Sequence, residues 1–112
     1  MREVHKEMKM VISKDAAAWF KRELSLQDGA YIRLFPRYSS GGGLHPGFSL
    51  GIADDPPGRP AVQTEQAGII FYMEEQDLWY MEGYGLSILY SEAEDDIEYV
   101  YEPEAAAGVL QE

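Results

Sequence analysis

The chain has no cysteine, and this absence removes a whole group of chemistries. Disulfide bonds, thiolate nucleophiles, cysteine-ligated zinc and cysteine-ligated iron–sulfur clusters are excluded, because each needs a thiolate sulfur. No apolar run approaches the ~20 residues that a membrane-spanning helix needs. The opening residues, MREVHKEMKMVIS, are charged throughout and lack the apolar core of a secretory signal. We therefore expect a cytoplasmic protein that does not bind membranes.

Positive charge is missing from the second half of the chain. No lysine or arginine follows Arg59, whereas residues 60–112 contain thirteen acidic residues. The formal net charge of the 112 residues is −11. Because such a surface repels phosphate backbones, we expect no nucleic-acid binding. The charge suits solubility, and it could also attract a basic protein partner or a hard cation.

One amphipathic helix is predicted near the N-terminus, in the segment SKDAAAWFKREL. Ser13 or Lys14 occupies the N-cap position, and Gly29 is suited to the left-handed residue that ends a helix. Residues 1–10 are charged and show no periodicity, so they are predicted to be a flexible extension. The apolar residues that share the helical spacing are Ala16, Trp19, Phe20 and Leu24.

The rest of the chain is typical of short strands joined by tight turns. Strand patterns occur in YIRLFPRY, GFSLGI, LSILY and IEYVY, and AVQTEQAGIIFYME predicts a hairpin that turns near Gln66 to Gly68. EQDLWYMEG predicts a short helical turn. We predict a mainly β (α+β) fold, a compact antiparallel β-sandwich or pseudo-barrel of about six to seven short strands with one N-terminal helix packed on it.

Three stretches of the chain, taken in order, carry a family resemblance. They are VISKDAAAWFKREL, YIRLFPRYSSGGGLHPGFSLGIAD and GIIFYMEEQDLWYMEGYGLSILYSE. The first stretch resembles the opening strand and helix of the HesB-like family, the A-type iron–sulfur cluster carriers. The second resembles that family's strand, Gly-rich loop and strand, and the third resembles its hairpin and the short turn with a YLDG-like end. The resemblance covers residues 11–103 and implies a HesB-like domain there, followed by a tail of residues 104–112.

The chain departs from that family at the metal-binding positions. The carriers hold iron or a cluster with three cysteines, one in the Gly-rich loop and two near the C-terminus. An ungapped placement puts the loop position at Gly43, and the EP at residues 102–103, which resembles the family's NP, puts the other two at Val109 and Gln111. None of these residues supplies a thiolate. The resemblance therefore implies a cysteine-free branch, related to iron–sulfur cluster assembly proteins, that inherits the fold without the cluster chemistry.

The Gly-rich loop, SSGGGLHPG, is the stretch that most favours a binding role. It matches neither the phosphate-binding pattern GxxxxGKS/T nor a GxGxxG that opens a helix. Flexible glycines between two strands are the simpler interpretation, although such loops often carry binding surfaces. The loop residues that are candidates for binding a ligand or partner are Gly41, Gly42, Gly43 and His45.

Arg33 and Arg37 lie on one face of a predicted strand, with Phe35 between them. Two guanidinium groups could clamp an anion, because each binds carboxylate or phosphate in a bidentate way. We favour pairing with carboxylates on neighbouring strands, since this chain offers many. The aromatic residues between Tyr72 and Tyr101 are predicted to be mostly core, and would form an interaction patch if several were exposed together.

The sequence favours a non-catalytic protein, because no nucleophile has an adjacent general base. We predict a HesB-like module without a cofactor that binds a protein or a ligand. The alternative is a metal-binding protein in which His45 and the carboxylates of Glu74 or Glu75 replace the thiolates. The predicted strand edges could also pair between two copies, so a homodimer is compatible with the sequence.

Overall fold

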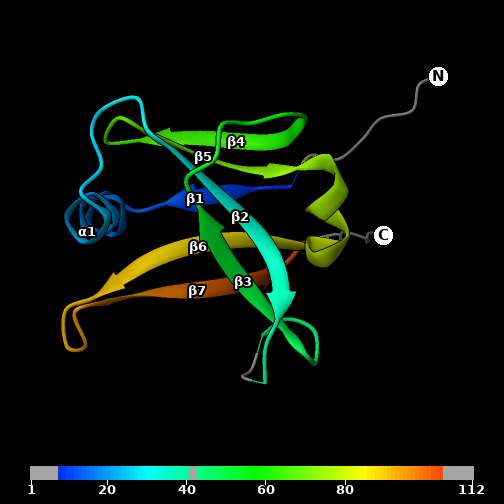
Figure 1. Ribbon diagram of the computed structural model, residues 1–112. Coiled ribbons are helices and arrows are strands. Elements are labelled where there is room, and N and C mark those ends of the chain that lie inside the picture. The colour runs from blue at the N-terminus through cyan, green and yellow to red at the C-terminus, as the bar shows by residue number, and fades with distance from the viewer. Residues whose placement is uncertain (1–7, 41–42, 105–112) are drawn as a thin grey trace.

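Two β-sheets and one α-helix build the part of the chain that the computed structural model describes, residues 8–40 and 43–104 (Figure 1). Gly41, Gly42, Val109 and Gln111 therefore lie outside the described residues. The three-stranded sheet has the order β1-β6-β7, and the four-stranded sheet has the order β3-β2-β5-β4. The described part of the chain contains helix α1 (Lys14–Leu24) and the 3-10 helix η1 (Glu75–Met81). The strands are β1 (Met10–Ile12), β2 (Tyr31–Tyr38), β3 (Phe48–Ala53), β4 (Pro60–Gln66), β5 (Ile69–Glu74), β6 (Tyr84–Ser91) and β7 (Asp96–Pro103).

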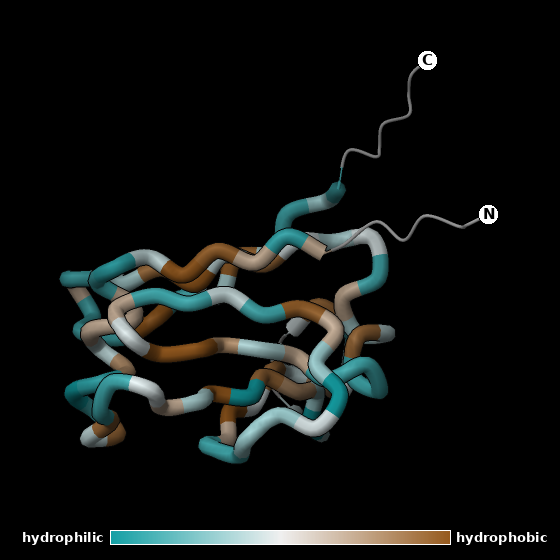
Figure 2. The backbone as a smooth tube through the Cα atoms, turned by 90° about the horizontal axis from the view of Figure 1, so that it is seen from above, coloured by the Kyte–Doolittle hydropathy of each residue, from teal (hydrophilic) through white to brown (hydrophobic). Residues whose placement is uncertain are grey.

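Both sheets and helix α1 contribute to one hydrophobic core, which confirms the predicted fold class. Alternate residues of the strands point inward, so Ile32 and Leu34 of β2 are fully buried. Phe20 of α1 packs edge-to-face on Phe71 of β5, with ring centroids 5.2 Å apart. Figure 2 shows apolar residues along the inner strands and hydrophilic residues in the turns at the ends. The described part of the chain contains no helix long and apolar enough to cross a membrane.

The predicted cap of helix α1 is confirmed at its N-terminus and is wrong at its C-terminus. Ser13 is the N-cap, and its hydroxyl oxygen accepts a hydrogen bond from the Ala16 amide at 3.0 Å. The left-handed C-cap is Ser25, with φ of 53°, and not Gly29 as the sequence predicted. Gly29 adopts φ of 92° one turn later, where its amide donates to the Gly68 carbonyl at 2.7 Å.

The sheets are not purely antiparallel, which corrects the sequence prediction. Strand β1 pairs in parallel with β6, and β2 pairs in parallel with β5. The other three pairings, β2 with β3, β4 with β5 and β6 with β7, are antiparallel. Tight turns predict antiparallel neighbours, but the two parallel pairs join segments far apart in the chain, which strand periodicity does not reveal.

The extension predicted for residues 1–10 is too long. Met8 is only 8% exposed, Met10 begins β1, and the Lys9 carbonyl between them accepts a hydrogen bond from the Leu86 amide at 2.9 Å. Burial alternates from residue 8 to residue 12, as it does in a half-buried strand. The charged flanking residues conceal this short alternation, and the packed domain therefore includes Met8.

Candidate functional site

Aromatic side chains gather where the loop between β2 and β3 meets helix η1. Tyr38 at the end of β2 stacks on Phe48 at the start of β3, with ring centroids 5.0 Å apart. Phe48 in turn contacts Trp79 of η1 edge-to-face at 5.4 Å, and His45 of the loop lies 6.0 Å from the Trp79 ring. Tyr38 is 86% exposed and Trp79 is 49% exposed. We call these four residues, Tyr38, His45, Phe48 and Trp79, the aromatic surface.

A buried tyrosine fixes the loop beneath the aromatic surface. The Tyr80 hydroxyl accepts a hydrogen bond from the Leu44 amide at 3.0 Å and donates to the Phe48 carbonyl at 3.4 Å. The Tyr80 carbonyl accepts a hydrogen bond from Nε2 of His45 at 3.1 Å, so this ring nitrogen carries a proton. Tyr80 is fully buried. The loop around His45 is therefore held to η1 by both the backbone and the side chain of one residue.

Gly43 must be glycine for this packing. A Cβ at position 43 would lie 2.2 Å from the Phe48 carbonyl oxygen and 2.7 Å from the Tyr80 hydroxyl oxygen. Both distances are far shorter than any normal contact of a carbon atom, so any side chain there would displace the backbone of β3 or the Tyr80 ring. This close approach explains the third glycine of the loop.

An ion pair anchors η1 to the four-stranded sheet. The Arg33 guanidinium donates to the Asp77 carboxylate at 2.6 Å, and it lies over the Phe35 ring, 5.2 Å from the centroid. The hydrogen bond to Asp77 raises the pKa of Arg33. Arg33 pairs with a carboxylate, as favoured, but that carboxylate comes from η1 and not from a neighbouring strand. Arg37 lies apart from this pair, beside Gly51 and Tyr99.

The structure does not bring together the residues of the alternative metal site. The Glu74 carboxylate accepts hydrogen bonds from the amides of Gly58 and Arg59, at 2.8 and 2.6 Å, and so fastens the loop before β4. Glu75 lines a groove with the same loop, whereas His45 belongs to the aromatic surface. Among the described residues, no three of the His, Asp and Glu side chains are grouped so that they could hold a metal ion.

A groove of about 440 Å³ opens beside the aromatic surface. Trp79 belongs to both features, and two acidic residues, Glu82 and Glu104, line the groove. Sequence reasoning missed this groove, because its residues come from three separate segments. Its lining residues are Met8, Leu78, Trp79, Met81, Glu82, Gly83 and Glu104.

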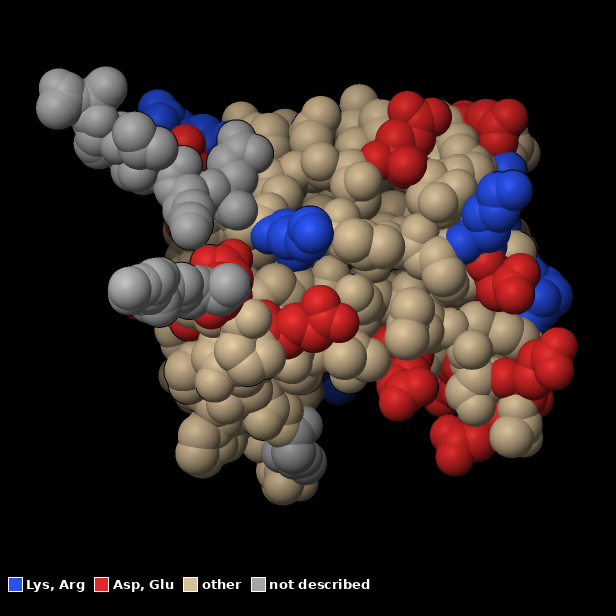
Figure 3. Space-filling model, turned by 180° about the vertical axis from the view of Figure 1, so that it is seen from behind, with Lys and Arg blue, Asp and Glu red and all other residues tan. Residues whose placement is uncertain are grey.

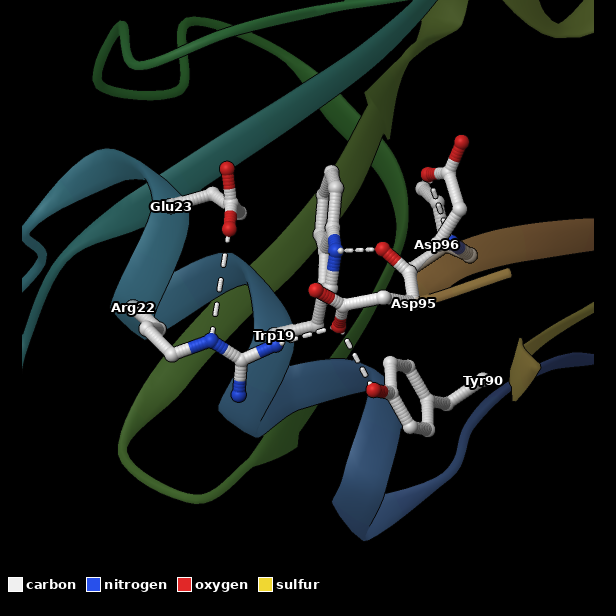
Figure 4. A network of polar contacts seen from close by, with 7 residues as sticks. Trp19, Arg22, Glu23, Tyr90, Asp95 and Asp96 are labelled. Atoms are coloured by element: carbon white, nitrogen blue, oxygen red, sulfur yellow. Dashed lines mark hydrogen bonds and ion pairs between the residues drawn. The ribbon is translucent and has the colours of Figure 1, made fainter. Parts of the chain in front are cut away.

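The acidic turn between β6 and β7 has a structural role at the other end of the molecule. The Asp95 carboxylate accepts hydrogen bonds from Arg22 at 3.0 Å and from the Tyr90 hydroxyl at 2.6 Å, and the Asp95 carbonyl accepts one from the Trp19 indole at 3.1 Å (Figure 4). The hydrogen bond to Asp95 raises the pKa of Tyr90. These contacts fasten the turn to helix α1, so Asp95 is engaged within the fold.

Comparison with known proteins decides the family. No known family profile matches the chain. A protein of Bacillus subtilis named pyruvate dehydrogenase inhibitor is 42% identical over 95 residues, which span 85% of this chain and 100% of that protein. The chain belongs to the family of this protein. An uncharacterized protein of Staphylococcus saprophyticus is 33% identical over 95 residues, spanning 82% of this chain and 97% of that protein.

A solved structure confirms the predicted HesB-like fold. Escherichia coli SufA, which is involved in the biosynthesis of iron–sulfur clusters, superposes with a TM-score of 0.57 at 13% sequence identity. The likeness covers 87% of this chain and 89% of SufA. At this identity it establishes the fold alone.

The residues present do not fit an iron–sulfur cluster. The chain offers no thiolate, and the position where the family resemblance places the loop ligand, Gly43, has no room even for a Cβ. The space that a loop ligand would need is filled by the Tyr80 hydroxyl and the Phe48 backbone. In this chain, packing of Phe48 and Tyr80 fills the space beside Gly43.

Proposed function

We propose that the protein is a non-catalytic regulator that binds pyruvate dehydrogenase and inhibits it. The observation that carries this proposal is the 42% identity to the Bacillus subtilis pyruvate dehydrogenase inhibitor over the whole length of that protein. Identity at this level over a full domain supports a shared mode of action. Inhibition by binding also agrees with the sequence, in which no nucleophile has an adjacent base.

The aromatic surface is the docking site that we propose for this partner. Trp and Tyr are the residues that most often dominate the binding energy of protein interfaces, because they bury a large area with few rotatable bonds. Trp79 and Tyr38 are exposed, and both are held in place by packing on Phe48. Such anchors lose little side-chain freedom when a partner covers them. His45 and the Gly-rich loop around it form the edge of the proposed interface.

The test is inhibition of a purified pyruvate dehydrogenase complex from the same organism, measured as the rate of NADH formation at increasing concentrations of the protein. We expect saturable inhibition by the wild-type chain. Trp79→Ala should weaken it by about 30-fold, the loss typical of a central interface residue. The matched control is Leu24→Ala, because Leu24 is similarly exposed but lies at the end of helix α1.

Two outcomes would contradict the proposal. The first is a wild-type chain that leaves the complex fully active while the Bacillus subtilis protein inhibits its own complex in the same assay. The second concerns the surface alone: if Leu24→Ala weakens inhibition as much as Trp79→Ala does, the aromatic surface is not the docking site. Circular dichroism and thermal unfolding of each variant separate lost binding from lost folding.

A further inference from the structure

We infer that the groove beside Trp79 receives a lysine or arginine side chain of the partner, and that this contact fixes the register of the complex. The inference rests on the proposed function, and it names the chemistry that the groove recognises. An apolar wall and a pair of carboxylates lie within one groove of about 440 Å³, which is the combination that a long cationic side chain needs.

The wall of the groove suits the aliphatic part of such a side chain. Met8 and Met81, which are both buried, line the groove together with Leu78 and Trp79. Lysine and arginine carry three or four methylene groups that gain free energy when they leave water. The half-exposed indole of Trp79 adds attraction for a cation above its face, and tryptophan is the strongest aromatic partner in such contacts.

The two glutamates that line the groove suit the charged head group. Glu82 and Glu104 both line the groove, and a hydrogen bond of 2.9 Å from the Glu104 amide to the Gly83 carbonyl holds the end of β7 beside the end of η1. Within the described residues neither carboxylate forms an ion pair, and no lysine or arginine lines the groove. The negative potential of Glu82 and Glu104 is therefore available to a partner.

The charge of the whole chain favours the same occupant. The net charge is −11 and no basic residue follows Arg59. On the face seen in Figure 3, acidic side chains predominate over basic ones. A basic partner surface is attracted at long range by this field, whereas a second copy of the chain is repelled. A basic partner is thus the occupant that both the groove and the overall charge select.

The first measurement tests the groove without any enzyme. The probe is the peptide acetyl-Gly-Lys-Gly-amide, titrated into the ¹⁵N-labelled full chain, with the two tryptophan indole N–H signals followed by NMR. We expect a saturable shift of the Trp79 signal and none of the Trp19 signal, which reports on the opposite end of the molecule. The shift should be lost in Glu82→Gln/Glu104→Gln. If the Trp79 signal does not move, or moves equally in the double variant, the inference is wrong.

The second measurement uses the pyruvate dehydrogenase complex, with binding followed by biolayer interferometry at low and high salt. Glu82→Gln/Glu104→Gln should bind about tenfold more weakly than wild type at low salt and show a smaller loss of affinity on adding salt. The matched control is Glu92→Gln/Glu94→Gln, which removes the same charge from the exposed turn between β6 and β7 and should stay within about twofold of wild type.

The two measurements separate failure of the inference from failure of the proposed function. If wild type binds the complex and both double variants bind equally well, the groove assignment is overturned and the proposed function stands. If wild type does not bind the complex although the peptide shifts Trp79, the groove recognises basic side chains and the proposed partner is wrong. If the peptide leaves the wild-type Trp79 signal in place while Arg2→Gln/Lys6→Gln moves it, the chain's own basic residues occupy the groove and the inference is overturned.

Discussion

The Arg33 guanidinium lies 2.6 Å from the Asp77 carboxylate, and this contact joins strand β2 to helix η1. Asp77 is the only buried charged residue in the described part of the chain. Two residues after it comes Trp79, which belongs to both the aromatic surface and the groove. The ion pair therefore helps to fix the position of Trp79, together with the buried Tyr80 and Met81 of the same helix.

Replacement of Asp77 should therefore affect both stability and binding. Asp77→Ala leaves the largely buried Arg33 charge without its partner, and we expect a loss of about 3 kcal/mol in the free energy of unfolding. Urea denaturation measures this loss. The Trp79 indole signal in NMR should shift as well, because η1 is no longer held to β2.

The exposed ion pair between Lys21 and Asp28 is the matched control for this prediction. Its nitrogen and oxygen atoms are 2.7 Å apart, but the Asp28 side chain is 82% exposed. Lys21 lowers the pKa of Asp28, although solvent screens the pair. Asp28→Ala should therefore change stability far less than Asp77→Ala and leave the Trp79 signal in place. Equal losses in the two variants would mean that burial of the Arg33–Asp77 pair does not determine its contribution.

Gly43 gives a second prediction, about the loop that the sequence singled out. Gly43→Ala places a Cβ against the Phe48 carbonyl and the Tyr80 hydroxyl, so the loop must move away from η1. We expect the free energy of unfolding to fall by about 2 kcal/mol, as in other overpacked sites. Gly58→Ala is the control, because a Cβ there meets only Glu74, at 3.5 Å, and should cost less than about 0.5 kcal/mol. If the two variants are equally stable, the loop does not pack as described.

Local chemistry explains which parts of the fold could be predicted from the sequence. The N-cap at Ser13 and the hairpin turn at Ala67 and Gly68, both with positive φ, follow from residue types within a few positions. The parallel pairing of β1 with β6 does not, because Met10 and Leu86 meet across most of the chain. A short strand with charged flanks, such as that from Met10 to Ile12, also leaves too weak a pattern to detect.

The candidate site divides in the same way. The Gly-rich loop with Gly43 and His45 stands out in the sequence, and the structure places both residues beside η1. Tyr80 and Phe48 give the loop its shape. The sequence shows that both are aromatic, but it does not show that they contact the loop. Nothing in the sequence distinguishes Glu82 from the other acidic residues, because only the fold places it at the groove. Side chains that act together across distant segments leave no spacing to recognise.

The pH dependence of stability gives the last prediction, at alkaline pH. Burial raises the pKa of Tyr99 to about 12, with a smaller contribution from the nearby charge of Asp96. The unfolded chain ionises this group near its ordinary pKa of about 10. Since the pKa is higher in the folded state, the stabilising contribution is complete below about pH 10 and is lost as the pH rises toward about 12.

Replacement of Tyr99 by phenylalanine should remove this contribution. Wild type should lose about 2 to 3 kcal/mol more than Tyr99→Phe when the free energy of unfolding is compared between about pH 9 and about pH 12. Urea denaturation at each pH measures it, and tyrosinate absorbance of the folded protein follows the ionisation directly. A Tyr99→Phe variant that follows the wild-type curve would show that Tyr99 ionises equally easily in the folded and unfolded chain.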